Sequence, residues 1–64
     1  MKFFLMQQNG LQRVIDVADI AEAWEATAGK TSLRLKSQAS AVLYDTTFSS
    51  FKTALQNNET VITV

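Results

Sequence analysis

The chain has 64 residues, no cysteine and no histidine, and its six Lys and Arg balance six Asp and Glu. Disulfides need cysteine and structural zinc sites are built from cysteine and histidine, so the composition excludes both as sources of stability. Residues 1–64 are expected to form a single small domain, and because a chain of this size buries only about 60% of its unfolded surface, we expect a homo-oligomer.

Charge and hydropathy patterning count against further classes of protein. Zero net charge counts against a free-standing nucleic-acid-binding domain, which usually carries a positive excess. Residues 3–6 are the only apolar run near the start, shorter than the ~7–15 residues of a secretory signal, and no later run approaches the ~20 needed to span a membrane. We therefore expect a cytoplasmic protein without a membrane partner, of a composition typical of bacterial or phage accessory proteins.

The first predicted element is a β-hairpin. Residues 2–7 are mostly apolar and aromatic, Asn9-Gly10 follows, and residues 11–17 have the composition of a returning strand. Asn-Gly is the strongest short signal for a type I′ turn, because both central residues of that turn need positive φ.

The next segment, residues 18–28, is compatible with two structures. Its Ala and Glu content, its apolar residues at helical spacing and the glycine that follows indicate a helix. As a strand it would pair with residues 31–36, whose apolar and polar side chains alternate, through a three-residue loop at 28–30. We favour the strand and leave the helix open.

The strand interpretation makes a specific prediction about cross-strand pairs. With the loop at 28–30, Trp24 would lie opposite Arg34 and Glu22 opposite Lys36. A cation–π contact and an ion pair would then stabilise the same outer face.

The second half of the chain predicts a strand, a helix and a strand. Residues 40–45 alternate as in a strand, and residues 61–64 are β-branched. Between them Phe48, Phe51 and Leu55 stand at helical spacing and are expected to face the core, with Asp45, Thr46 or Thr47 available as the N-terminal cap.

The element order β-β-β-β-α-β predicts an α+β domain, in which a small antiparallel sheet of four to five strands packs on one amphipathic helix near the C-terminus. The strands expected over 3–6 and 61–64 carry neither Pro nor an internal Lys. Exposed edges of that kind invite strand addition, so we expect each to pair within the chain or with a second copy.

Four stretches follow one another in an order found in a known family: Asn9-Gly10, Ile20-Ala21-Glu22, Thr31–Leu35 and Val42–Asp45. This order resembles the bacterial FlbD/SwrD-type swarming-motility family, and the middle of the chain is also similar to the first half of a LytTR-type DNA-binding domain. Both resemblances support the strand interpretation of residues 18–28, and the first places a turn at Asn9-Gly10. The chain has Ser37-Gln38-Ala39 where the family usually has Gly-Lys, and no site residues are transferred from either family.

Enzyme chemistry is not expected. Without His and Cys the chain lacks the commonest general base and the best nucleophile, and it has neither a G-x-S-x-G motif nor a glycine-rich phosphate loop. Asp16, Asp19, Glu22 and Glu25 would form one acidic stripe on a helix, which we interpret as a solvated face rather than a cation site. We predict no catalytic, cofactor-binding or metal-binding residues.

Binding to another protein is the function that the sequence favours, with Trp24, Arg34, Lys36 and Tyr44 as the partner-binding residues. Trp24 has small alanine neighbours and little of its own chain to cover it, as in many interface anchors. Packing of Trp24 in the core remains open. The alternative is a nucleic-acid-binding regulator that uses Lys30, Arg34, Lys36 and aromatic residues of the sheet.

Overall fold

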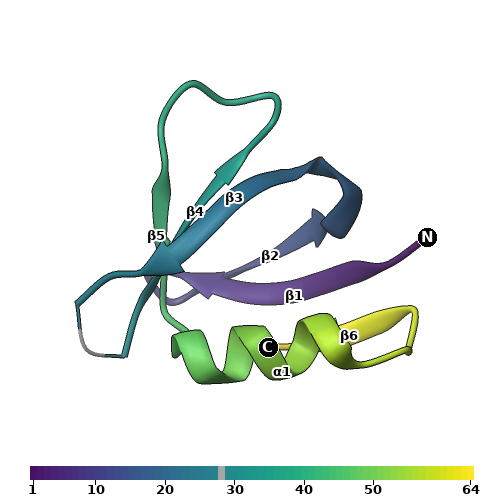
Figure 1. The fold of residues 1–64 in the computed structure, drawn as a ribbon. Coiled ribbons are helices and arrows are strands. Elements are labelled where there is room, and N and C mark those ends of the chain that lie inside the picture. Colours follow the sequence, from purple (N-terminus) through teal and green to yellow (C-terminus); the bar gives the residue numbers. More distant parts are fainter. Residues whose placement is uncertain (28) are drawn as a thin grey trace.

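The computed structural model describes residues 1–27 and 29–64, and within these ranges it contains six strands, one α-helix and one 3₁₀ turn (Figure 1). In chain order these are β1 Phe3–Gln8, β2 Leu11–Asp16, the 3₁₀ turn η1 Val17–Asp19, β3 Ile20–Glu25, β4 Thr31–Leu35, β5 Val42–Tyr44, α1 Phe48–Gln56 and β6 Val61–Thr63. The predicted α+β class is confirmed. Ala28, the first residue of the expected 28–30 loop, lies outside the described residues.

The strands form two three-stranded sheets, so the predicted single antiparallel sheet is wrong. One sheet has the order β2-β1-β6 and the other β3-β4-β5. The two separate at η1, where the Asp16 carboxylate accepts a hydrogen bond from the Ala18 N–H at 3.0 Å and turns the chain away from β2. In addition, β6 runs parallel to β1, because α1 carries the chain back to the starting end of β1.

The predicted hairpin is confirmed. β1 and β2 pair antiparallel with Gln8 opposite Leu11, and the two residues between them are Asn9 at φ 53° and Gly10 at φ 79°. Positive φ at both positions is what a type I′ turn requires, and Asn and Gly tolerate it best.

Residues 20–25 form strand β3, so the strand interpretation of the contested segment is confirmed and the helix interpretation is wrong. β4 decides the outcome, because it is a nearly fully buried strand that needs hydrogen-bonded neighbours on both sides. Helical propensity in residues 18–28 is worth a few tenths of a kcal/mol per residue, whereas an unpaired buried backbone group costs ~1–3 kcal/mol.

The predicted helix is confirmed, with Thr47 as its cap. The Thr47 side chain accepts a hydrogen bond from the Ser50 N–H at 3.1 Å. Phe51 is buried and Phe48 is partly buried, but Leu55, which we expected in the core, is 45% exposed. Ala54 is buried instead, because its small side chain brings the last turn of this nine-residue helix close to the sheet.

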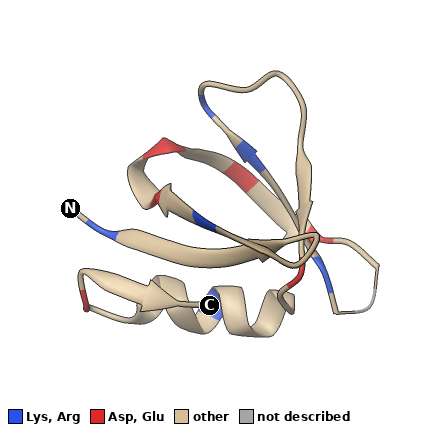
Figure 2. Cartoon of the chain, turned by 180° about the vertical axis from the view of Figure 1, so that it is seen from behind, with Lys and Arg blue, Asp and Glu red and all other residues tan. Residues whose placement is uncertain are grey.

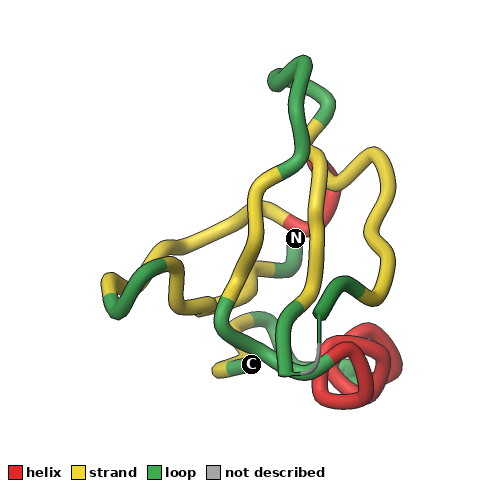
Figure 3. Tube along the Cα trace, turned by 90° about the vertical axis from the view of Figure 1, so that its left-hand side faces the viewer, coloured by secondary structure: helices red, strands yellow, loops and turns green. Residues whose placement is uncertain are grey.

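One hydrophobic core joins both sheets and the helix. It contains side chains from five strands and α1, namely Phe4, Met6, Ile15, Leu33, Leu35, Tyr44, Phe51, Ala54 and Ile62. Phe4 meets Phe51 edge-to-face at 5.7 Å between ring centroids, and the Asp45 N–H donates to Gln7 O at 2.7 Å where β5 reaches the end of β1. Figure 3 shows the two sheets enclosing this interior, with α1 at its lower edge.

Candidate partner-binding surface

The pairing of β3 with β4 differs from the predicted register by two residues. Trp24 lies opposite Ser32 and Glu22 lies opposite Arg34, so the expected pairs Trp24 with Arg34 and Glu22 with Lys36 are wrong. The loop between β3 and β4 causes this difference. Because the last paired residues are Glu25 and Thr31, the loop is longer than the three residues assumed from the sequence.

Two backbone hydrogen bonds close the loop between β3 and β4. The Ala26 N–H donates to Lys30 O at 3.3 Å, and the Lys30 N–H donates to Thr27 O at 3.0 Å. A bulge between Ile20 and Glu22 then leaves Ala21 exposed. Residues Glu22 and Trp24 therefore share the outer face of the sheet.

The centre of this outer face is a row of three side chains, one from each strand. Ser32 on the central strand β4 lies opposite both Trp24 on β3 and Leu43 on β5. Trp24 is 43% exposed and Leu43 is 48% exposed, whereas Ser32 is only 9% exposed. Two large apolar side chains thus flank a short one, roughly 10 Å apart across two strand spacings. We call Trp24, Ser32 and Leu43 the Trp24 surface.

Ion pairs within the chain stand on both sides of the Trp24 surface. On one side Arg34 Nε contacts Glu22 Oε1 at 3.0 Å, and on the other Lys30 Nζ contacts Asp45 Oδ1 at 2.5 Å. Figure 2 shows the same mixing across the whole chain, with Lys and Arg interspersed with Asp and Glu. The outer face of β3-β4-β5 therefore has an apolar centre and a polar rim, which is the usual anatomy of a protein interface.

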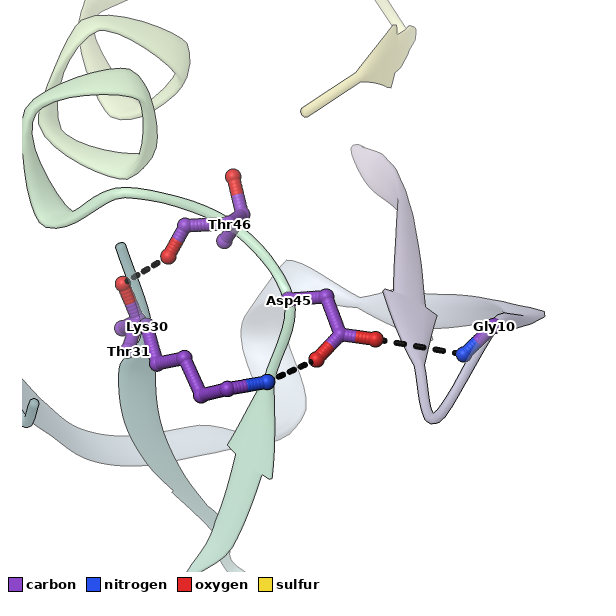
Figure 4. Close-up of polar contacts among 5 residues, drawn as sticks. All are labelled: Gly10, Lys30, Thr31, Asp45 and Thr46. Atoms are coloured by element: carbon purple, nitrogen blue, oxygen red, sulfur yellow. Dashed lines mark hydrogen bonds and ion pairs between the residues drawn. The ribbon is translucent and has the colours of Figure 1, made fainter. Parts of the chain in front are cut away.

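Asp45 also connects the two sheets (Figure 4). Its carboxylate accepts hydrogen bonds from Lys30 Nζ and from the Gly10 N–H of the first hairpin, the latter at 3.2 Å. The hydrogen bond from Lys30, supported by the one from Gly10, lowers the pKa of Asp45 below 3.8. Beside it Thr31 Oγ1 donates to Thr46 O at 2.9 Å, which satisfies a buried hydroxyl.

The four side chains predicted to bind a partner are not brought together. Trp24 is exposed, Arg34 is held by Glu22, and Lys36 is exposed in the turn after β4. Tyr44 has no exposed surface and packs in the core, where its hydroxyl accepts a hydrogen bond from Arg13 Nη1 at 3.0 Å. The Trp24 surface therefore does not include Tyr44.

Sequence reasoning missed Ser32 and Leu43. Alternation along β5 could have found Leu43, because Val42 and Tyr44 both pack toward the core and the residue between them must point outward. Ser32 could be placed only once the register with Trp24 was known. The acidic residues do not form a stripe. Asp19 accepts from Ser37 Oγ, Glu22 binds Arg34, and no cluster of metal-ligating side chains is found among the described residues.

Two findings complete the description. Within residues 1–27 and 29–64 no helix has the length and apolar character needed to cross a membrane. Comparisons with family models, with curated proteins and with solved structures find no match to this chain, and the resemblance to the FlbD/SwrD type stays a prediction.

Proposed function

We propose that the protein is a small, non-enzymatic, self-associating interaction module that binds another protein through the Trp24 surface. The observation that carries the proposal is the row Trp24, Ser32 and Leu43, in which two exposed apolar side chains flank a short one. Tryptophan beside a small neighbour is typical of residues that dominate binding energy, because a partner side chain can desolvate the ring completely.

The paired charges around this row support binding to protein. Because Glu22 and Asp45 already neutralise Arg34 and Lys30, a partner does not have to supply charges to compensate them. The rim pairs would orient the partner and exclude others, while the apolar centre would supply the affinity. Its mechanism would be occupancy of a surface rather than chemistry on a substrate.

The alternative is a nucleic-acid-binding regulator that uses Lys30, Arg34, Lys36 and aromatic side chains of the sheet. Two of these three basic side chains have acidic partners, and Tyr44 is not available for base stacking. We therefore favour a protein partner. The two functions differ in their response to salt, because phosphate binding weakens steeply with ionic strength and an apolar contact does not.

The test compares the wild type with matched surface variants. Wild type, Trp24→Ala, Leu43→Ser and Leu11→Ser are immobilised in parallel, and the proteins that each retains from a cell lysate of the source organism are quantified by mass spectrometry. Leu11 is a suitable control because it is 73% exposed in the first hairpin, outside the Trp24 surface. A specific partner should be retained by the wild type and by Leu11→Ser, and lost with the other two variants.

The partner is then purified and titrated at low and high salt. We expect Trp24→Ala to weaken binding at least ~30-fold, corresponding to about 2 kcal/mol, with a small salt dependence. Trp24 emission should shift to the blue on binding, because the ring leaves water. Retention of the partner by Trp24→Ala, or a steep loss of affinity with salt, would contradict the proposal.

A further inference from the structure

The free edge of β6 carries backbone groups that point away from the rest of the protein. Phe3 N–H donates to Thr60 O at 2.7 Å and Val64 N–H donates to Leu5 O at 2.9 Å, so residues 60, 62 and 64 bond to β1. In a parallel ladder the intervening residues then direct their N–H and C=O groups to the opposite side. Those residues are Val61 and Thr63, and in the described part of the chain neither forms a hydrogen bond beyond the sheet.

The other sheet edges are protected. β2 carries Arg13 and Asp16, β3 carries two glutamates and a bulge, and the end of β5 is hydrogen-bonded to β1 through the Asp45 N–H. Charges, bulges and covering contacts are the usual means of preventing strand addition. β6 has none of these within the described residues: its sequence is Val-Ile-Thr, and in Figure 2 it is drawn without a charged residue.

A hollow of about 330 Å³ lies beside this edge, between β6 and α1. Figure 3 shows α1 viewed nearly along its axis, at about the same level as the C-terminal end of the chain. Its lining is uncharged and made mostly of small or hydroxyl-bearing side chains, namely Ser49, Ser50, Thr53, Ala54, Asn57, Ile62, Thr63 and Val64. An extended segment added to β6 would lie along this hollow without burying an unpaired charge.

We infer that a second copy of this chain occupies the β6 edge, with β6 of each copy pairing antiparallel about a two-fold axis at Ile62. This inference rests on the self-association in the proposed function and names its surface. Val61 of one copy would lie opposite Thr63 of the other, and each pair would exchange two N–H···O bonds. The second copy fits because its own β6 is as uncharged as the hollow that receives it.

The contact is of the size expected for a transient dimer. The strip formed by β6 and the nine residues of α1 is ~14 Å long at ~1.5 Å per helical residue. With a width of about one strand spacing plus one helix diameter, ~15 Å, it covers roughly 200 Å² per copy, against ~800 Å² per partner in a standard interface. Dimers should therefore form at concentrations approaching ~1 mM rather than in dilute solution.

The experiment follows the full chain over a concentration series up to ~1 mM. Sedimentation velocity gives the mass, and ¹H–¹⁵N spectra show which amides change. Wild type should gain mass with concentration, and the largest shifts should be at the Val61 and Thr63 amides, because these donors acquire partners. Hydrogen exchange at both amides should slow at the same time.

Two groove variants and two controls locate the interface. Thr53→Arg and Thr53→Asp place a charge of either sign in the hollow, while Gln56→Arg adds the same charge on the exposed side of α1, outside the lining residues. Both Thr53 variants should weaken dimerisation at least ~10-fold, because either charge would have to be desolvated. Gln56→Arg and Trp24→Ala should dimerise like wild type. Spectral dispersion verifies that each variant folds.

Three results would overturn the inference: a chain that stays monomeric up to ~1 mM, a dimer that survives both Thr53 substitutions, or a dimer abolished by Trp24→Ala. If the free edge of β6 binds only a peptide from another protein, the chain will also stay monomeric in this series. The proposed partner site is separate from the β6 edge. Thr53→Arg should therefore still bind a protein partner through the Trp24 surface. Failure at β6 and failure at Trp24 are thus distinguishable.

Discussion

On the outer face of β3-β4-β5, charged side chains stand in pairs on either side of an apolar centre, whereas the outer face of β2-β1-β6 combines apolar and uncharged polar side chains with a single charged residue. In the latter sheet Leu5 lies opposite Val14 and Phe3 lies opposite Val61, and Val14 and Val61 are 63% and 52% exposed. The one charged residue among these cross-strand pairs is Asp16, and its side chain caps η1. The two sheets are therefore alike inside and different outside.

This difference shows how a 64-residue chain divides its surface. It has one α-helix in its described residues, and that helix covers the interior rather than either outer face. The described residues leave both outer faces uncovered. In the proposed function, the face framed by ion pairs would discriminate among partners through its charges, while the nearly uncharged face beside the free edge of β6 would suit a second copy of the chain.

The largest expected effect is the loss of folding stability when a side chain of the shared core is truncated. Leu33→Ala removes a fully buried side chain of β4 and should destabilise the fold by ~2–5 kcal/mol, out of the ~3–10 kcal/mol that a chain of this length has. Urea unfolding followed by far-UV circular dichroism measures the loss. The matched variant is Leu43→Ala on the exposed side of the same sheet, which should cost less than ~1 kcal/mol.

Equal losses for Leu33→Ala and Leu43→Ala would contradict the assignment of inner and outer faces. The comparison also separates fold from function. Leu43→Ala should reduce partner binding in a protein that unfolds at nearly the urea concentration of the wild type.

The second effect concerns the contact between the sheets at Asp45. Its pKa is below 3.8 in the folded chain, so the carboxylate form stabilises the fold. The stabilisation is complete above pH ~4, the ordinary pKa, and is lost as pH falls through the lower folded-state pKa. Asp45→Asn should therefore lower the Tm at pH 7, and the difference from wild type should shrink toward pH 2.

Thermal unfolding of both proteins from pH 7 to pH 2 checks this expectation. Glu59→Gln, which removes an exposed carboxylate from the loop before β6, is the control and should follow the wild-type curve. A Tm difference between Asp45→Asn and wild type that is the same at pH 2 and pH 7 would mean that hydrogen-bond geometry, rather than charge, connects the sheets.

The same residues show how far the sequence predicts this fold. Local signals were sufficient for the hairpin at Asn9-Gly10 and for the helix capped by Thr47, because each depends on neighbouring residues only. The parallel pairing of β6 with β1 could not be predicted in this way, since it joins residues nearly sixty positions apart, such as Phe3 and Val61. The sequence had predicted that both segments need a pairing partner, but not that they find one in each other.

The candidate site was predicted only in part for a related reason. Composition indicated that Trp24 has small neighbours, and it is exposed. Its cross-strand partner depended on a connection whose length the sequence did not reveal, and a difference of two residues replaced Arg34 by Ser32. Register errors of this kind leave a residue on the correct face but change what stands beside it.

The smallest expected effect is at the rim of the Trp24 surface. Glu22 and Arg34 have side chains that are 57% and 33% exposed, so their ion pair should contribute only ~0.2–1 kcal/mol to folding. A double-mutant cycle with Glu22→Gln and Arg34→Gln, measured by urea unfolding at low and high salt, gives the coupling energy. Lys36→Gln is the control, because Lys36 has no acidic partner among the described residues.

The value of the pair should appear in binding rather than in folding. The double variant Glu22→Arg/Arg34→Glu keeps an ion pair at this place but exchanges the positions of its positive and negative charges. It should leave the stability within ~0.5 kcal/mol of wild type and slow association with a charged partner, because complementary charges act mainly on the encounter rate. A coupling energy above ~2 kcal/mol would instead make Glu22 and Arg34 part of the fold, and the two outer faces would then differ less than their exposed charges indicate.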